Sequence, residues 1–83
     1  MSTKLFVGSL PWSVDDEELK QAFEKQGTVV SAKVVKDRDT GRSRGFGFVE
    51  MENSADAKNA IKALNESELN GRNIVVNEAK ART

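Results

Sequence analysis

The chain has 83 residues, which is enough for one small domain with a single hydrophobic core but not for two. It contains no cysteine and no histidine, which excludes disulfides, thiolate and imidazole metal sites, and the catalytic triads that need either residue. The 13 lysines and arginines balance 13 aspartates and glutamates, so nucleic-acid binding would have to come from a local arrangement of charge.

The first part of the chain predicts a strand followed by a helix. Residues 4–9 (KLFVGS) alternate in character, which places Leu5 and Val7 on one side of a strand and Phe6 on the other. Residues 15–27 begin with an acidic turn, as helix N-termini favour, and continue with apolar residues at helical spacing until a glycine ends the helix.

The middle of the chain predicts an antiparallel hairpin. Residues 28–36 (TVVSAKVVK) are rich in β-branched side chains, and their alternation directs Val30 and Val34 toward the core. Residues 37–43 (DRDTGRS) form a polar turn that contains a glycine, and residues 44–51 (RGFGFVEM) form the returning strand.

The last part predicts a second helix and a final strand. Ser54 is expected to cap the helix, whose apolar residues recur at helical spacing as far as Leu64. Residues 65–71 are turn-like, and residues 73–77 (NIVVN) form the last strand.

The element order β-α-β-β-α-β predicts a ferredoxin-like sandwich of the α+β class, with a four-stranded antiparallel sheet and two helices on one face. Two amphipathic helices cover only one face of such a sheet, so the other face stays open. By strand alternation, Phe6, Phe46 and Phe48 fall on the open face. Exposed aromatic rings among lysines and arginines are typical of a surface that stacks unpaired bases.

Two stretches in this pattern resemble the signature motifs of the RNA recognition motif family. RGFGFVEM, residues 44–51, matches the octapeptide basic-Gly-aromatic-Gly-aromatic-aliphatic-x-aromatic at every position except the last, which is Met51. LFVGSL, residues 5–10, is similar to the family's hexapeptide, with Ser9 in the place of its usual asparagine. The similarity extends from about Lys4 to Lys80, and the motifs are in the family's order and spacing.

The resemblance implies a single domain over residues 1–83, with its core at about 4–80, that binds single-stranded RNA and functions in RNA metabolism or post-transcriptional regulation. Single-stranded DNA is a second expected ligand if few contacts involve the 2′-hydroxyl. The resemblance also implies a monomer that is not an enzyme and has no cofactor, small-molecule substrate or membrane partner. The residues that it assigns to RNA are Lys4, Phe6, Lys33, Arg42, Arg44, Phe46, Phe48, Asn77 and Lys80.

Two other functions fit parts of the pattern. The acidic first helix or the aromatic face could grip a partner peptide, and a phosphate-processing enzyme could share the same element order. The enzyme would need a phosphate-binding loop after the first strand, and GSLPWSV (residues 8–14) supplies neither an arginine nor a glycine-rich nest. Trp12 in this loop is expected to pack over the start of the first helix.

The first residues, MSTKLFVGSLP, contain an apolar run that is too short for a signal peptide or a membrane span. Together with the absence of cysteine, this predicts a cytoplasmic protein.

Overall fold

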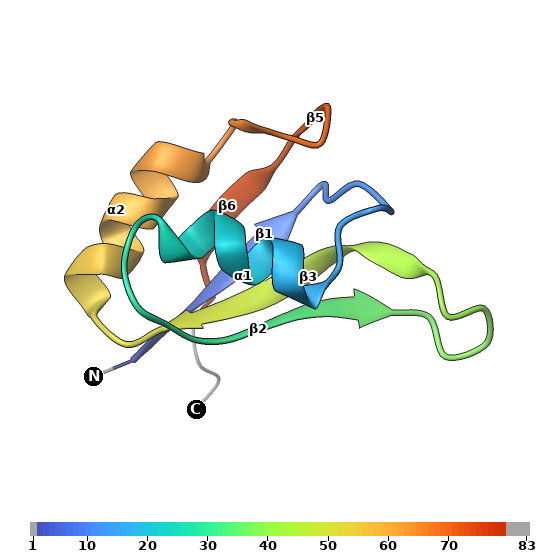
Figure 1. Ribbon diagram of the computed structural model, residues 1–83, viewed down its shortest axis with the longest axis horizontal. Helices are drawn as coiled ribbons and strands as arrows, with labels where there is room; N and C mark the ends of the chain where they lie inside the picture. Colours follow the sequence, from blue (N-terminus) through green and yellow to red (C-terminus); the bar gives the residue numbers. More distant parts are fainter. Residues whose placement is uncertain (1, 80–83) are drawn as a thin grey trace.

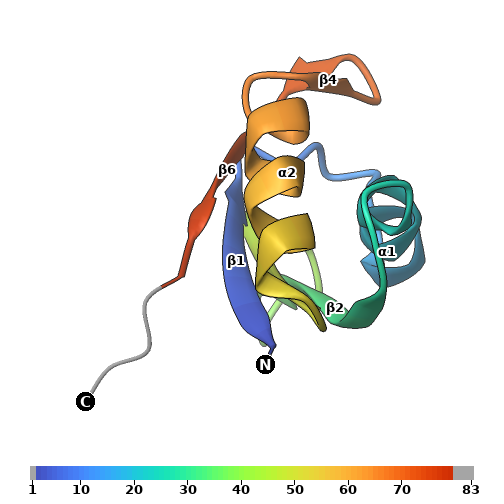
Figure 2. The ribbon, with the colours of Figure 1, turned by 90° about the vertical axis from the view of Figure 1, so that its left-hand side faces the viewer.

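The computed structural model describes residues 2–79, which form a four-stranded antiparallel sheet of order β2-β3-β1-β6 with two helices packed on one face (Figures 1 and 2). The predicted α+β fold is therefore confirmed. No helix in this part of the chain is long and apolar enough to cross a membrane. The elements are β1 (Thr3–Gly8), α1 (Asp16–Glu24), β2 (Val29–Lys36), β3 (Ser43–Met51), α2 (Ser54–Leu64), β4 (Glu68–Leu69), β5 (Arg72–Asn73) and β6 (Val75–Glu78).

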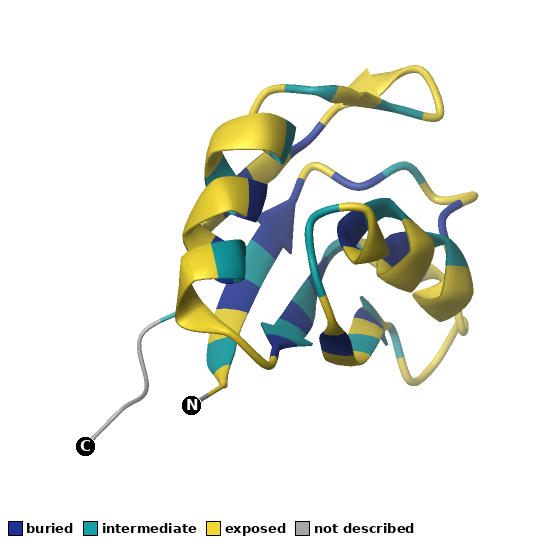
Figure 3. Ribbon diagram, turned by 60° about the vertical axis from the view of Figure 1, so that its left-hand side comes forward, coloured by how far each residue is buried: buried dark blue, intermediate teal, exposed yellow. Residues whose placement is uncertain are grey.

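The hydrophobic core lies between the sheet and the helices. Both helices turn their buried residues toward the sheet and leave their outer faces exposed (Figure 3). Met51, the residue that departs from the family's octapeptide, is fully buried here, as its position in the strand alternation requires. The core includes Leu5, Val7, Leu19, Phe23, Val34, Val49, Met51, Ala57, Ala60 and Val76 from the sheet and helices, and Ile74 from the short connection between β5 and β6.

The alternation of β2 predicts that Val30 points into the core, but its side chain is 55% exposed. The register between β2 and β3 shifts between Val29 and Ser31, which is a bulge that adds one residue to the edge strand. The extra residue reverses the inward and outward directions of the side chains that precede the bulge. Val29 therefore points into the core in place of Val30.

The helix ends differ in detail from those predicted. Asp15 caps α1 as expected, and its Oδ1 accepts a hydrogen bond from the backbone N–H of Glu18 at 2.8 Å. The second helix is capped by Asn53, whose Oδ1 accepts from the N–H of Ala55 at 2.8 Å, while Ser54 is the first helical residue.

The segment after α2 contains a short hairpin that the sequence pattern did not separate from a plain turn. Its strands β4 and β5 are joined by Asn70 and Gly71, which have φ angles of 50° and 86°. Positive φ at both central residues is the requirement of the tight hairpin turn that Asn-Gly favours. The Nδ2 of Asn70 donates to Oε2 of Glu18 at 2.8 Å and so connects this hairpin to α1.

Asp16 also joins α1 to the sheet, because its Oδ1 accepts a hydrogen bond from the backbone N–H of Val34 at 2.7 Å. Since β2 is an edge strand, its outward amides lack a strand partner, and Asp16 supplies one. We expect Asp16→Ala to lower the free energy of unfolding by about 1–2 kcal/mol, measured by urea denaturation. The exposed neighbour Glu17→Ala is the matched control, and equal losses in the two variants would contradict a role for this bond.

Candidate nucleic-acid interface

Phe6, Phe46 and Phe48 lie on the face of the sheet opposite the helices. Phe6 in β1 pairs directly with Phe48 in β3, and Phe46 pairs with Gly8. Their neighbours along the strands, such as Val7 and Val49, are fully buried under the helices, whereas the three rings are half-buried. The rings therefore belong to the open face, as strand alternation predicts.

The three rings form one continuous aromatic surface, which we call the ring cluster. The centroids of Phe6 and Phe46 are 5.9 Å apart with their planes inclined by 29°, and those of Phe6 and Phe48 are 5.9 Å apart at 67°. Phe46 and Phe48 are 6.3 Å apart and nearly perpendicular, at 88°. These are favourable aromatic geometries, so each ring is held by the other two and presents its remaining surface to solvent.

The strand register extends the ring cluster into a row that crosses all four strands. Lys33 on β2 pairs with Phe48, and Asn77 on β6 pairs with Phe6. Both side chains are exposed, so a cation and an amide lie at opposite ends of the row. The sequence also places Lys80 at the end of this last strand, but that residue lies outside the described part of the chain.

A charged row lies next to the rings. The Nζ of Lys4 is 5.6 Å from the centroid of the Phe48 ring, within the range of a cation–π contact. Lys4 pairs across the strands with Glu50, whose Oε2 accepts a hydrogen bond from Oγ of Ser2 at 2.5 Å. The sequence alone assigned no role to Glu50, although its spacing from Phe48 puts its carboxylate on the same face.

The two predicted arginines lie where β3 departs from regular alternation. The register between β2 and β3 shifts at this point, and Gly45 has a φ of +85°, a value that favours glycine. The side chain of Arg44 is exposed, and because the alternation is interrupted here, the strand register does not place it on the same face as Phe46. Arg42 is exposed in the hairpin loop, and its carbonyl accepts from the N–H of Asp37 at 2.7 Å.

The sequence predicts that Trp12 packs over the start of α1, but this prediction is wrong, because the residue is 71% exposed. The backbone N–H of Val14 donates to the carbonyl of Pro11 at 3.2 Å and closes a turn with Trp12 at its corner. Leu10 and Val14 on either side of the corner are 1% and 2% exposed, so these two residues make the contacts with the core.

Comparisons with known proteins agree with this geometry. The family model of the RNA recognition motif matches residues 5–75. The chain is 57% identical over 83 residues to glycine-rich RNA-binding protein 4, mitochondrial, of Arabidopsis thaliana, covering all of this chain and 61% of that relative. The RNA-binding protein PG1 is similar in structure, with a TM-score of 0.92, 47% identity and 98% of each chain covered. The Sxl-lethal protein/RNA complex aligns with a TM-score of 0.87 and 35% identity, over 93% of this chain and 47% of that one.

The expected cytoplasmic location is contradicted, since several of the similar relatives are named as mitochondrial or chloroplastic proteins. That expectation depended on a short apolar run and a lack of cysteine, and neither property distinguishes these compartments from the cytosol. The family itself is clear from the match over residues 5–75 and from the shared fold. This chain belongs to the RNA recognition motif family.

Proposed function

We propose that this domain binds single-stranded RNA on the open face of its sheet. The observation that carries the proposal is the ring cluster, because three half-buried rings in mutual contact on a rigid sheet match the flat faces of unpaired bases. Relatives that are named RNA-binding proteins, and a similar structure that is an RNA complex, support the same conclusion.

Each member of the site has a proposed role. Phe6 and Phe48 stack on successive bases, and Phe46 packs against riboses. The ammonium of Lys4 lies over the Phe48 ring, so an incoming base displaces it toward the neighbouring phosphate. The remaining contacts are with phosphates, from Lys33, Arg42 and Arg44, and with base edges, from Asn77 and Lys80.

The energies of stacking explain how a chain with no net charge can bind a polyanion. Each base stacked on an aromatic side chain is worth about 1–3 kcal/mol by alanine substitution. Two or three such contacts therefore provide most of the affinity, while the local cations position the backbone.

The proposal also covers which part of the chain forms the RNA-binding module and what the whole protein does. We propose that residues 4–80 act as one independent RNA-binding module, for which the described core provides a single packed unit. Because the chain spans 61% of the length of the mitochondrial relative, a role of the whole protein in RNA metabolism or post-transcriptional regulation is part of the same proposal.

A titration with single-stranded RNA tests this function. We expect a mixed-sequence pool of short oligomers at low salt to shift the backbone amide resonances of β1 and β3 and to leave those on the outer faces of α1 and α2 unchanged. Duplex RNA of the same sequences is the control, because its paired bases cannot stack on the rings. DNA oligomers of the same sequences show whether the 2′-hydroxyl contributes.

Two outcomes would contradict the proposal. The first is an absence of binding to every RNA pool. The second is a set of shifts confined to the helices, which would favour the alternative of a peptide-binding module.

A further inference from the structure

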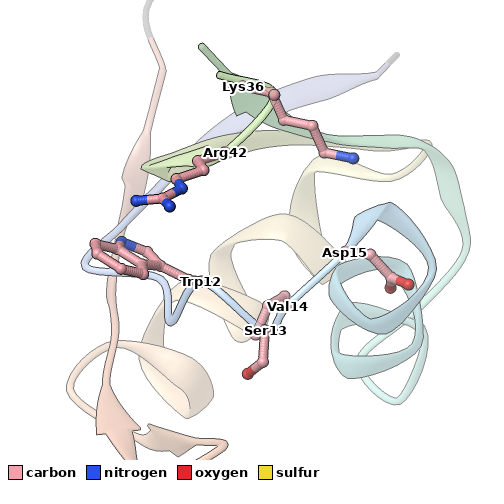
Figure 4. A pocket seen from close by; sticks show the side chains of 7 residues that line it. Trp12, Ser13, Val14, Asp15, Lys36 and Arg42 are labelled. Atoms are coloured by element: carbon pink, nitrogen blue, oxygen red, sulfur yellow. The ribbon is translucent and has the colours of Figure 1, made fainter.

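A hollow of about 500 Å³ lies between the β1–α1 loop and the β2–β3 hairpin, at the end of the sheet that these loops form (Figure 4). Its lining includes Trp12 and Asp15 from the loop and Lys36 and Arg42 from the hairpin. The volume is in the range that accommodates a small organic ligand. The hollow therefore combines an aromatic ring with two cations outside the ring cluster.

The ring in this hollow is available to a ligand. Of the large hydrophobic residues in the described chain, Trp12 is the most exposed. The turn between Pro11 and Val14 holds it at a corner, and the burial of Val14 anchors that turn to the core. The indole is thus presented to solvent by a fixed backbone, which lowers the entropy lost when a base stacks on it.

The charges of the hollow favour an anion. Figure 4 shows the guanidinium of Arg42 beside the indole of Trp12 at one side of the hollow, and the side chains of Lys36 and Asp15 at the opposite side. The carboxylate of Asp15 already accepts a hydrogen bond from the N–H of Glu18 at 2.8 Å as the cap of α1. Arg42 beside the indole and Lys36 across the hollow then provide the positive charge that a phosphate in the hollow would meet.

The hollow is close, along the chain, to the ring cluster. Gly8 pairs with Phe46, and the four residue-to-residue steps from Gly8 to Trp12 span at most about 14 Å of chain. The loop is fixed to β3 by a hydrogen bond of 2.8 Å from the N–H of Leu10 to the carbonyl of Gly45. A strand of RNA that leaves the ring cluster at Phe46 can therefore continue to Trp12.

We propose that Trp12, Lys36 and Arg42 form a further subsite that holds one unpaired nucleotide of the bound RNA. The base stacks on the indole of Trp12, and the guanidinium of Arg42 and the ammonium of Lys36 meet its phosphate. This inference depends on the proposed function, because the same strand occupies the ring cluster and the hollow.

The fluorescence of Trp12 tests the subsite directly, because the chain has one tryptophan and no tyrosine. The probes are mixed-sequence, single-stranded RNA oligomers of four and eight nucleotides. We expect the longer oligomer to quench the indole emission, and Trp12→Ala to weaken its binding at least about fivefold while leaving the shorter oligomer within about twofold of the original affinity. Trp12→Phe keeps a flat ring and retains most of the affinity for the longer oligomer.

The cations are tested by the salt dependence of binding. Arg42→Ala is expected to reduce the slope of log affinity against log salt by about 0.7 for the longer oligomer, which is one phosphate contact on a single strand. Lys62→Ala, on the outer face of α2, is the matched control and leaves the slope unchanged.

The outcomes separate this inference from the proposed function. If Phe48→Ala binds both oligomers as the original chain does, the proposed function itself is wrong. A different set of results would overturn the subsite alone. In that case Phe48→Ala loses binding, which supports the ring cluster as the RNA-binding surface. The longer oligomer, however, leaves the Trp12 emission of the original chain unchanged, and Trp12→Ala binds this oligomer with the original affinity.

Discussion

Replacing Phe48 with alanine is expected to weaken binding to single-stranded RNA by about 5- to 150-fold, the equivalent of one lost base stack of about 1–3 kcal/mol. Phe48 occupies the centre of the proposed interface. Its ring contacts those of Phe6 and Phe46 at 5.9 and 6.3 Å, and it pairs with Lys33 on the adjacent strand. Direct titration of a fluorescently labelled RNA measures the effect.

The same substitution also lowers stability, and the two effects have to be separated. Phe48→Ala removes two ring–ring contacts, each worth about 0.5–1.5 kcal/mol, so we expect the free energy of unfolding to fall by about 1–3 kcal/mol. The domain stays folded because the core under the helices is built from other residues. Binding is therefore compared well below the midpoint of thermal unfolding.

Two conservative replacements provide matched controls. Phe48→Tyr keeps a flat ring and should retain most of the RNA affinity, while Phe48→Leu keeps apolar bulk without a face on which a base can stack. Equal affinities for RNA in the leucine and tyrosine variants would show that the position contributes packing alone, and the stacking role would be abandoned.

The open face could be predicted from the sequence because it depends on one simple property of strands. Phe6 shares a side with Lys4, and Phe48 shares a side with Phe46, wherever a strand keeps its period of two residues. The buried neighbours Leu5 and Val49 fix which side is the core, since a slip of one residue would expose both.

The prediction for Val30 was wrong because that period is interrupted, and the placement of Arg44 stays a prediction for the same reason. A bulge exposes Val30, and a register shift next to Gly45 leaves Arg44 without a position that alternation can define. No composition or spacing in a single sequence marks either interruption, because each depends on how two strands pair.

The remaining features of the site lie in loops, whose conformation the sequence pattern does not predict. Trp12 is exposed because the backbone turns at that point, whereas apolar character alone suggested burial. Ser9 has a φ of 57°, a left-handed conformation that asparagine tolerates better than most residues, which explains the family's usual residue there. The hollow beside Trp12 joins segments that are distant in the sequence, so only the folded chain reveals it.

The two glycines of RGFGFVEM have different physical roles. Gly45 has a backbone conformation that side chains disfavour, whereas Gly47 lacks room for a side chain. A Cβ added to Gly47 would lie 2.5 Å from the carbonyl oxygen of Lys33 and 3.1 Å from Cα of Val34, both backbone atoms of β2. It would also lie 3.2 Å from Cδ2 of Leu19 in α1. Gly47 therefore lets the helix and the edge strand approach the strand that carries the rings.

Gly47→Ala is expected to lower the free energy of unfolding by about 3 kcal/mol, at the upper end of the usual effect of overpacking, because backbone atoms of β2 cannot rotate away. For a domain of this size, such a loss lowers the midpoint of thermal unfolding by about 12–24 °C. Differential scanning calorimetry of the variant and the original chain measures this shift.

Gly41→Ala is the matched control for the effect of side-chain volume. Gly41 has a φ of +72° but no heavy atom within 4 Å of an added Cβ, so this substitution introduces backbone strain of about 1 kcal/mol without a clash. If Gly47→Ala destabilised the domain no more than Gly41→Ala, the close approach of β2 and α1 would not be a constraint on the fold. If it destabilised the domain as expected, the glycine beside the rings would be required by packing beneath the sheet, independently of any contact that the rings make with RNA above it.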